Sequence, residues 1–474
     1  MPELTTDVAV IGAGTAGLAA YRAARAAGRR ALLIEGGVHG TTCARVGCMP
    51  SKLLIAPAEA AHMVERFPAF GLRLEGRVAV DGRAVMERVR RERDRFVGFV
   101  IEGVDAMPAA DKLAGDARFV SDTRLVVGSD VFVDARAIVI ATGSSPSWPP
   151  AWRALGERLV TNEEVFEWND LPRSVAVFGP GVIGLELGQA LHRLGVRVKV
   201  FGRSGSIGQL TDPALIAEAT RVFGAEFPLD TRARVEVSAD DDGVLVTEHG
   251  ADGATLGAAR SEHFEYLLAA TGRRPNVAGL GLEHTTLVRD TAGVPVFDRE
   301  TLQCGDAPVF IAGDANDDIP LLHEAADEGR IAGDNAARYP DVRAGLRRAP
   351  LSIIFTDPQI AIVGGGYAAL AGGEFVTGEV SFENQGRSRV MLRNRGRLHV
   401  YADPASGALL GAEMLGPDAE HLGHLLAWAL QLDLTIAGML HLPFYHPVVE
   451  EGLRTALRDA QAKIRERARA RRVA

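Results

Sequence analysis

Short apolar runs separated by glycine-rich turns recur along the chain and predict an α/β organisation. The first run, Asp7–Ile11, reads as a buried strand and is followed by Gly12-Ala13-Gly14-Thr15-Ala16-Gly17. An alanine-rich segment suited to a helix comes next, and a second apolar run over residues 31–34 ends at Glu35. Strand, glycine turn, helix and strand in this order predict a βαβ unit that binds a dinucleotide.

The same pattern returns in the middle of the chain. Residues 174–178 form a second apolar run, followed by Gly179-Pro180-Gly181-Val182-Ile183-Gly184 and by another strand-like run over 197–201. Each unit is later closed by an apolar strand that ends in Thr-Gly, first at Thr142-Gly143 and then at Thr271-Gly272. We therefore expect two Rossmann-like domains rather than an array of short repeats.

The remaining segments differ in pattern. A helix is expected over 85–104, and a hairpin over 235–248 that turns at Asp240-Asp241-Asp242-Gly243. Beyond Ala349, strand-like runs precede a helical segment over 419–432 and a helical tail from Leu453. The predicted fold class is α/β, with two Rossmann-like domains and a C-terminal α+β domain.

Composition narrows the classes of function. The 474 residues carry a net charge of -9, which disfavours binding to nucleic acid or to anionic membranes. The apolar stretch Val8–Ala20 follows Glu3 and Asp7 and is interrupted by glycines, so it resembles neither a signal peptide nor a membrane span. Three cysteines cannot form a disulfide framework, so we expect the protein to be located in a reducing cytoplasm.

The first glycine motif has the residues that a dinucleotide site needs. Gly12 permits the tight turn, Gly14 lets the backbone approach a pyrophosphate, and Gly17 lets the helix pack on the strand. Glu35 lies 23 residues after Gly12, where an acid binds an adenosine ribose. The alternative, a glycine-rich turn in another kind of α/β domain, does not account for all five elements in order.

The second unit lacks that acid. The position 23 residues after Gly179 is Gly202, and Arg203 follows it. Loss of the acid removes repulsion against a ribose 2′-phosphate, and a nearby arginine can pair with one, which favours NADP(H) or tolerance of it. An alternative interpretation of equal weight is that Arg203 is only an exposed loop residue.

Cys43 and Cys48 carry the candidate redox chemistry. They lie five residues apart, soon after the first βαβ unit, with a helix start expected near Cys48. Arg45 and Lys52 supply positive charge, which stabilises the thiolate that attacks disulfides. The alternative is a pair of buried structural cysteines. Cys304 is interpreted as a small core or loop residue.

Two further segments hold candidate polar groups. His446 is followed by Pro447 and, five residues on, by Glu451, and a carboxylate beside an imidazole can orient it as a base. An apolar strand over 309–311 leads to Asp314, which can accept a hydrogen bond from a sugar or ribityl hydroxyl.

Together these segments resemble the pyridine nucleotide–disulfide oxidoreductase family over nearly the whole chain, and within it the dihydrolipoamide dehydrogenases. The resemblance is carried by the two GxGxxG units, Cys43-x4-Cys48-x3-Lys52, Gly272-Arg273-Arg274-Pro275-Asn276, Ala312-Gly313-Asp314, Phe355-Thr356-Asp357-Pro358, and His446-Pro447 with Glu451.

The resemblance implies roles for individual residues. Cys43 would face the disulfide substrate, Cys48 would lie against the flavin, and Lys52 would sit near the flavin and pair with Glu186. His446 and Glu451 would come from the other subunit, so the enzyme would be a homodimer. The implied FAD contacts are Gly12, Gly14, Gly17, Glu35, Thr42, Lys52, Gly115, Thr142, Gly143, Ser144, Asp314, Leu322 and His323. The implied NAD(P) contacts are Gly179, Gly181, Gly184, Arg203 and Gly272; no metal site is expected.

The implied domains are an FAD-binding domain over 1–149 and 273–347, an NAD(P)-binding domain over 150–272, and an interface domain over 348–474. Three positions depart from the family pattern. Thr41 and Arg45 stand where the family usually has Gly and Asn, and Gly202 stands where dihydrolipoamide dehydrogenases usually have Glu.

The leading hypothesis is oxidation of dihydrolipoamide to lipoamide with NAD(P)+ through Cys43 and Cys48. The candidate partner under this hypothesis is a 2-oxo acid dehydrogenase complex. The closest alternative is NADPH-dependent reduction of glutathione or another small disulfide, which Gly202, Arg203 and Arg45 favour. A subunit that mainly docks in a complex would keep its role in a Cys43→Ser variant. A flavin transhydrogenase or NADH oxidase would keep its activity in a Cys48→Ser variant.

Overall fold

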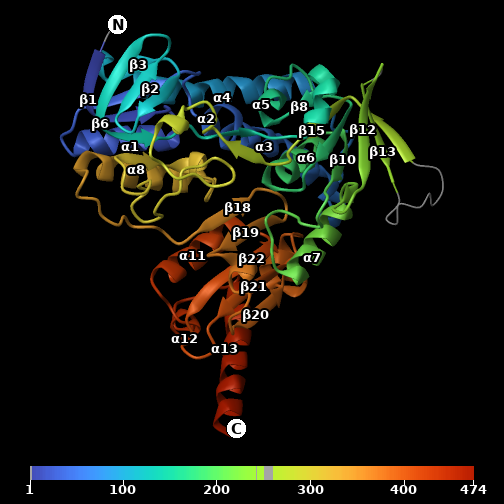
Figure 1. Ribbon diagram of the computed structural model, residues 1–474. Coiled ribbons are helices and arrows are strands. Elements are labelled where there is room, and N and C mark those ends of the chain that lie inside the picture. Colours follow the sequence, from blue (N-terminus) through green and yellow to red (C-terminus); the bar gives the residue numbers. More distant parts are fainter. Residues whose placement is uncertain (1–2, 242, 250–259, 474) are drawn as a thin grey trace. The chain divides into compact units, whose positions relative to one another are not determined.

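The computed structural model describes residues 3–241, 243–249 and 260–473 (Figure 1). The chain divides into two compact units, and each is made of three stretches of sequence. The first comprises Met1–Pro50, Arg88–Ser147 and Gly272–Arg347, and the second comprises Ser51–Glu87, Trp148–Thr271 and Arg348–Ala474.

The first unit is built on a mostly parallel sheet. Strand β1 (Glu3–Ile11) pairs in parallel with β2 (Ala31–Glu35) and with β6 (Val131–Ile140), and the strand order is β3-β2-β1-β6-β5-β4. Strand β17 (Val309–Ile311) pairs in parallel with β6. The other strands of this sheet are β3 (Lys112–Ala114), β4 (Ala117–Ser121) and β5 (Arg124–Val127). Residues 8–11 of β1 are covered on both faces, which explains why this half of the strand is a continuous apolar run.

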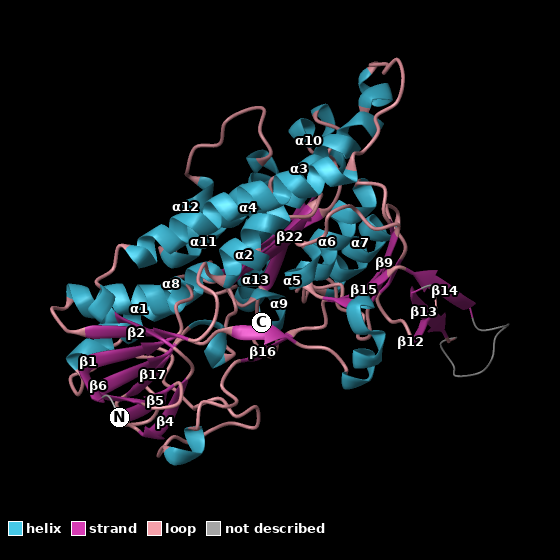
Figure 2. Ribbon diagram, turned by 90° about the horizontal axis from the view of Figure 1, so that it is seen from above, coloured by secondary structure: helices cyan, strands magenta, loops and turns pink. Residues whose placement is uncertain are grey.

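Helices α1 (Thr15–Ala26) and α8 (Leu322–Arg338) pack on one face of this sheet (Figure 2). Val8 and Val10 of β1 point into that helical layer, and the alternate residues Ala9 and Ile11 point into the core on the opposite face. The glycine turn between β1 and α1 needs its glycines: Gly12 has a φ of +105°, and a Cβ there would lie 2.4 Å from the carbonyl oxygen of Ala141.

The second unit contains a parallel sheet of the order β11-β10-β9-β15-β8. Strands β9 (Ser174–Phe178) and β10 (Arg197–Phe201) flank helix α6 (Val182–Arg193), as predicted. The predicted hairpin is confirmed by the pairing of β12 (Val235–Asp240) with β13 (Gly243–Glu248); its turn residue Asp242 lies outside the described residues. The remaining strands here are β8 (Leu159–Val160), β11 (Leu229–Asp230), β14 (Arg260–Phe264) and β15 (Tyr266–Ala269).

The C-terminal part of this unit is an antiparallel sheet of the order β18-β19-β22-β21-β20. Its strands are β18 (Leu351–Ile354), β19 (Gln359–Val363), β20 (Val376–Ser381), β21 (Arg397–Ala402) and β22 (Leu409–Gly416). Along β21, Leu398 and Val400 face a core that α11 (Ala419–Gln431) and α13 (Glu450–Val473) complete. The predicted α+β domain is therefore confirmed.

The candidate redox residues lie on the helices α2 (Thr42–Val46) and α3 (Cys48–Glu65), and α4 (Gly82–Asp105) follows them in the sequence. Helix α3 begins at Cys48, as predicted.

The remaining elements are α5 (Asn162–Val165), α7 (Pro213–Gly224), α9 (Gly366–Ala369), α10 (Gly386–Val390), α12 (Ile436–Leu440), β7 (Ser144–Pro146) and β16 (Arg273–Pro275). Within the described residues, 3-10 turns occupy Phe67–Phe70, Ala109–Asp111, Pro150–Arg158, Leu282–His284, Gly313–Asn316 and Phe382–Asn384. No helix in the described part of the chain combines the length and the apolar character needed to cross a membrane. The limits given above for the four domain segments remain predictions.

Candidate functional site

The first glycine turn leaves space for a phosphate group. A Cβ built at Gly14 would meet no atom within 4 Å, so the turn presents its backbone to an open region at the start of α1. Glu35 braces the turn from the end of β2: its carboxylate accepts hydrogen bonds from the amides of Ala13 at 2.6 Å and Gly37 at 2.8 Å. Open backbone at a helix N-terminus is the arrangement that binds a pyrophosphate.

Polar groups gather where β6 and β17 end. Ser144 donates a hydrogen bond of 2.7 Å to Asp314, and Arg273 donates one of 2.8 Å to the hydroxyl of Ser144. The hydroxyl of Thr142 and Nδ1 of His39 are buried and have no hydrogen-bond partner among the described residues. Because buried polar atoms are normally paired, these atoms fit the role of partners for a ligand such as FAD.

The other implied FAD contacts lie on the same unit. Gly143 follows Thr142, and a Cβ there would meet no atom within 4 Å. Gly115 follows β3 with a φ of +140°, and Leu322 and His323 open α8. Of the implied set, only Lys52 belongs to the second unit.

The two cysteines stand at the starts of adjoining helices. Cys43 is the second residue of α2 and is half-buried, while Cys48 is the first residue of α3 and is exposed. The link between the helices folds back over the first cysteine: a Cβ at Gly47 would lie 3.2 Å from Cα of Cys43 and 3.1 Å from the carbonyl oxygen of Thr42. This close approach favours a residue without a side chain between the two helices.

Thr41 precedes α2 in an unusual conformation. Its φ of 59° and ψ of 148° fall in a region that β-branched residues rarely occupy, at a cost of about 1–3 kcal/mol. Its hydroxyl accepts a hydrogen bond of 3.3 Å from the amide of Ala44, and such a cap contributes about 1 kcal/mol. The cap therefore offsets only part of the cost.

Arg45, the cation expected beside the cysteines, folds back over the preceding loop. Its guanidinium donates to the carbonyl oxygen of Val38 at 3.5 Å. Its aliphatic stem lies against Gly40, where a Cβ would be 3.0 Å from Cδ of Arg45. Arg45 thus packs against the turn that carries Thr41.

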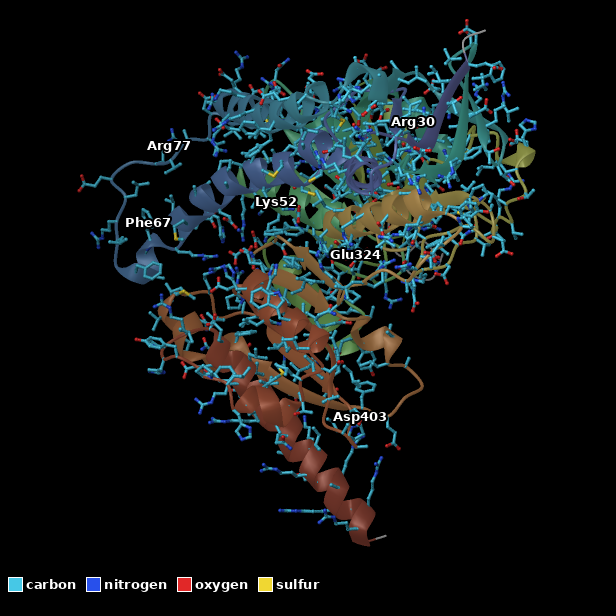
Figure 3. All side chains as sticks on the ribbon, turned by 90° about the vertical axis from the view of Figure 1, so that its left-hand side faces the viewer. Arg30, Lys52, Phe67, Arg77, Glu324 and Asp403 are labelled. Atoms are coloured by element: carbon cyan, nitrogen blue, oxygen red, sulfur yellow. The ribbon has the colours of Figure 1, made fainter. Side chains whose placement is uncertain are left out.

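Lys52 forms the ion pair that the resemblance implied. Lys52, which is labelled in Figure 3, lies one helical turn after Cys48 in α3. Its Nζ is 2.8 and 2.9 Å from the two carboxylate oxygens of Glu186 on α6. Glu186 is almost completely buried and also accepts a 3.0 Å hydrogen bond from the amide of Phe355. The ammonium lies 4.5 Å from the centre of the Phe355 ring.

His446 and Glu451 form a second pair. Nδ1 of His446 is 3.0 Å from the carboxylate of Glu451, in the first turn of α13. The hydrogen bond from His446 lowers the pKa of Glu451. The imidazole is 80% exposed, so its other nitrogen is open to a reactant that approaches from outside.

The second glycine turn also has open space, because a Cβ at Gly181 would meet no atom within 4 Å. At the end of β10 there is no room for a side chain. A Cβ at Gly202 would lie 2.9 Å from both Cγ of Pro180 and the carbonyl oxygen of Thr231. Arg203 is exposed, and the guanidinium of Arg232 lies against Gly205, where a Cβ would be 2.6 Å from it.

The sequence predictions did not include Arg232, Arg273 or His39 as site residues. Arg273 stands in a motif that the resemblance used, whereas the other two carried no sequence signal. Cys304 is 1% exposed, which confirms that it is a small core residue, and burial raises its pKa to about 12. Among the described residues, no three His, Cys, Asp or Glu side chains form a cluster able to hold a metal ion.

Two open glycine turns on Rossmann-like domains, a cysteine turn and a C-terminal α+β domain define a flavoprotein disulfide oxidoreductase. The model of the family described as "Pyridine nucleotide-disulphide oxidoreductase" matches residues 6–329, and that of its dimerisation domain matches residues 351–457. The chain belongs to the pyridine nucleotide-disulphide oxidoreductase family. Its cofactors are FAD and a nicotinamide dinucleotide, NAD or NADP.

Its relatives carry different names. A mercuric reductase of Acidithiobacillus ferrooxidans is 32% identical over 95% of this chain and 81% of its own length. Dihydrolipoyl dehydrogenase 3 of Pseudomonas aeruginosa is 30% identical, over 96% of this chain and 98% of its own. The family is therefore shared, while the substrate differs between the relatives.

Two solved structures share the fold. LpdA from Mycobacterium tuberculosis superposes with a TM-score of 0.80 at 23% identity, over 97% of this chain and 99% of that chain. The HOCl-induced flavoprotein disulfide reductase RclA from Escherichia coli gives 0.78 at 22% identity, over 96% and 99%.

Proposed function

We propose that this enzyme exchanges electrons between a nicotinamide dinucleotide and a dithiol–disulfide couple through Cys43 and Cys48, with dihydrolipoamide as its substrate. The observation that carries the proposal is the cysteine turn. Cys43 and Cys48 open two helices, and Gly47 folds the connection back over Cys43. Such a turn suits a pair that cycles between disulfide and dithiol.

The overall reaction balances as dihydrolipoamide plus NAD(P)+ giving lipoamide, NAD(P)H and a proton. In the oxidised enzyme Cys43 and Cys48 share a disulfide. One substrate thiolate attacks the sulfur of Cys43 and releases the thiolate of Cys48. The second substrate thiol then displaces Cys43, so that lipoamide leaves and both cysteines hold the two electrons. FAD, when bound, would supply the redox chemistry that links this dithiol to the nicotinamide.

Most of the residues proposed to hold FAD lie in the first unit. The open turn at Gly14 would receive the pyrophosphate, with Glu35 bracing that turn. Thr142 and Asp314 would offer polar groups to the rest of the cofactor. Lys52, held by Glu186, would keep a positive charge one turn beyond Cys48.

His446 is proposed as the base. Deprotonation of the substrate thiol needs a group that accepts a proton, and Glu451 orients the imidazole so that its exposed nitrogen can do so. Because the chain carries the family's dimerisation domain, we propose a homodimer in which this pair serves the cysteines of a second copy. Association with a 2-oxo acid dehydrogenase complex would follow only if the substrate is a protein-bound lipoyl group.

A second candidate is NADPH-driven reduction of a small disulfide. The loop after β10 favours this candidate. An acid at position 202 would clash with Pro180 and Thr231. Arg203 belongs to this loop, and the guanidinium of Arg232 lies against Gly205 of the same loop. Two arginines beside this turn suit a ribose 2′-phosphate. The same disulfide chemistry would then run in the opposite direction.

The test compares both directions with purified enzyme. Dihydrolipoamide is offered with NAD+ or NADP+, and lipoamide or oxidised glutathione is offered with NADPH. Fast dihydrolipoamide turnover supports the first proposal, and turnover confined to NADPH with glutathione or another small disulfide supports the second. Cys43→Ser and Cys48→Ser should abolish either activity, while Cys304→Ala, in the core, should keep it. Full activity of both serine variants would overturn both proposals.

A further inference from the structure

We propose that Thr41 is a positioning residue that fixes the backbone on which the Cys43 thiol stands. The inference rests on the proposed role of Cys43 as the thiol that meets the substrate. It starts from the conformation of Thr41, whose φ of 59° is one that glycine adopts freely and threonine does not.

Thr41 holds both residues that follow Cys43. Its hydroxyl accepts the hydrogen bond from the amide of Ala44 at 3.3 Å, and its carbonyl oxygen accepts one from the amide of Arg45 at 3.1 Å. The turn itself is fixed from outside, because a Cβ at Gly40 would lie 2.8 Å from Cγ1 of Val97 and because Arg45 packs over it. Cys43 therefore lies in the chain between Thr41 and the two residues whose backbone amides are bonded to Thr41.

A glycine at position 41 would keep part of this arrangement. It would adopt the same φ without strain, and its carbonyl oxygen would still accept from Arg45. It would lose the threonine side chain, and with it the hydroxyl that binds the amide of Ala44. The bond between the side chain of Thr41 and Ala44 is thus the local contribution of the threonine, and the residue next to that bond is Cys43. The threonine side chain therefore orders the backbone beside the Cys43 thiol but lowers the stability of the folded protein.

The test measures the reactivity of Cys43 without any disulfide substrate. Wild-type enzyme and the variants Thr41→Gly and Thr41→Ser are reduced with dithionite and treated with iodoacetamide between pH 5 and 10. Mass spectrometry reports the alkylation of Cys43, and Cys43→Ser serves as the blank. Thermal midpoints are recorded in parallel.

We expect Thr41→Gly to raise the thermal midpoint and to slow alkylation of Cys43 about five-fold at neutral pH, the effect of one ordinary hydrogen bond. Thr41→Ser keeps the hydroxyl and should follow the wild type in its alkylation curve.

An alkylation curve of Thr41→Gly that coincides with the wild type overturns the inference, whether the midpoint rises or falls. Equal slowing in Thr41→Ser also overturns it, because the hydroxyl would then not be the cause. The measurement needs no knowledge of the substrate. A failure of dihydrolipoamide turnover would therefore count against the proposed substrate and leave this result standing.

Discussion

Lys52 and Glu186 lie 134 residues apart in the sequence, and Nζ of one is 2.8 Å from the carboxylate of the other. The pair joins α3 to α6 inside one unit. Both partners have a further neighbour in Phe355, whose ring faces the ammonium and whose amide binds the carboxylate. The ammonium one turn beyond Cys48 is thus held by two contacts with distant parts of the chain.

Removal of the carboxylate should destabilise this unit. Glu186→Ala leaves the ammonium of Lys52 and the amide of Phe355 without their acceptor. Breaking a buried pair costs about 3–5 kcal/mol, and we expect less here because the Lys52 side chain is 33% exposed. Urea unfolding followed by flavin fluorescence measures the loss. Glu186→Gln keeps an acceptor and should lose less; equal midpoints for the wild type and the alanine variant would contradict the prediction.

The His446 imidazole should matter for turnover and little for stability. His446→Gln removes the proposed base and should reduce kcat by about 10²–10⁴-fold. The thermal midpoint should stay within about 2 °C of the wild type, since the side chain is 80% exposed and an exposed contact contributes little. The matched control is His441→Gln, an exposed histidine of the same region. A kcat for His446→Gln equal to that of the control would show that His446 takes no part in catalysis.

The nicotinamide preference should depend on two arginines. Arg203→Ala and Arg232→Ala should each raise KM for NADPH about 10–100-fold, the range expected for loss of a charge-assisted hydrogen bond. Values for NADH should change less than about two-fold, because its ribose has no phosphate for an arginine to pair with. Arg234→Ala, two residues further on and exposed, is the control. Equal effects on both dinucleotides would argue against a 2′-phosphate site.

Asp357 should set part of the acid stability. Burial alone would raise the pKa of Asp357, but Arg193, Arg66 and Arg395 outweigh it and hold the pKa at about 2, below the ordinary 3.8. The stabilisation that the ionised Asp357 carboxylate gives the folded state is therefore complete above about pH 4 and is lost as the pH falls towards 2. Its size, from the two pKa values, is about 2 kcal/mol.

Asp357→Asn should accordingly unfold more easily than the wild type at pH 7, and the difference should shrink below pH 4. Thermal midpoints measured between pH 3 and pH 7 would follow this convergence. Glu87→Gln, at an exposed carboxylate on α4, should change neither the midpoint nor its pH dependence. Parallel curves for Asp357→Asn and the wild type would refute the assignment.

The elements of the two Rossmann-like domains could be predicted because their strands are buried on both faces and read as apolar runs. The Gly12 turn could be predicted because its spacing follows from backbone sterics. The pairing of Lys52 with Glu186 came from a resemblance to a family, since no periodicity relates residues on two different helices.

Other features could not be read from the sequence. The contact of Arg232 with the loop after β10 depends on β11 lying beside β10, which is a tertiary fact. The positive φ of Thr41 has no signature in its residue type, because threonine is an improbable choice there. His39 became a candidate only when the structure showed its Nδ1 buried without a partner.

The crowding around Gly202 limits how dinucleotide preference can evolve or be engineered in this scaffold. Grafting a glutamate onto that position would drive its Cβ against Pro180 and the Thr231 carbonyl, so the obvious single exchange is blocked. A route towards NAD would have to begin elsewhere, either by relaxing Pro180 first or by placing the acid at 203. The order in which such mutations are introduced would therefore decide whether the intermediates fold.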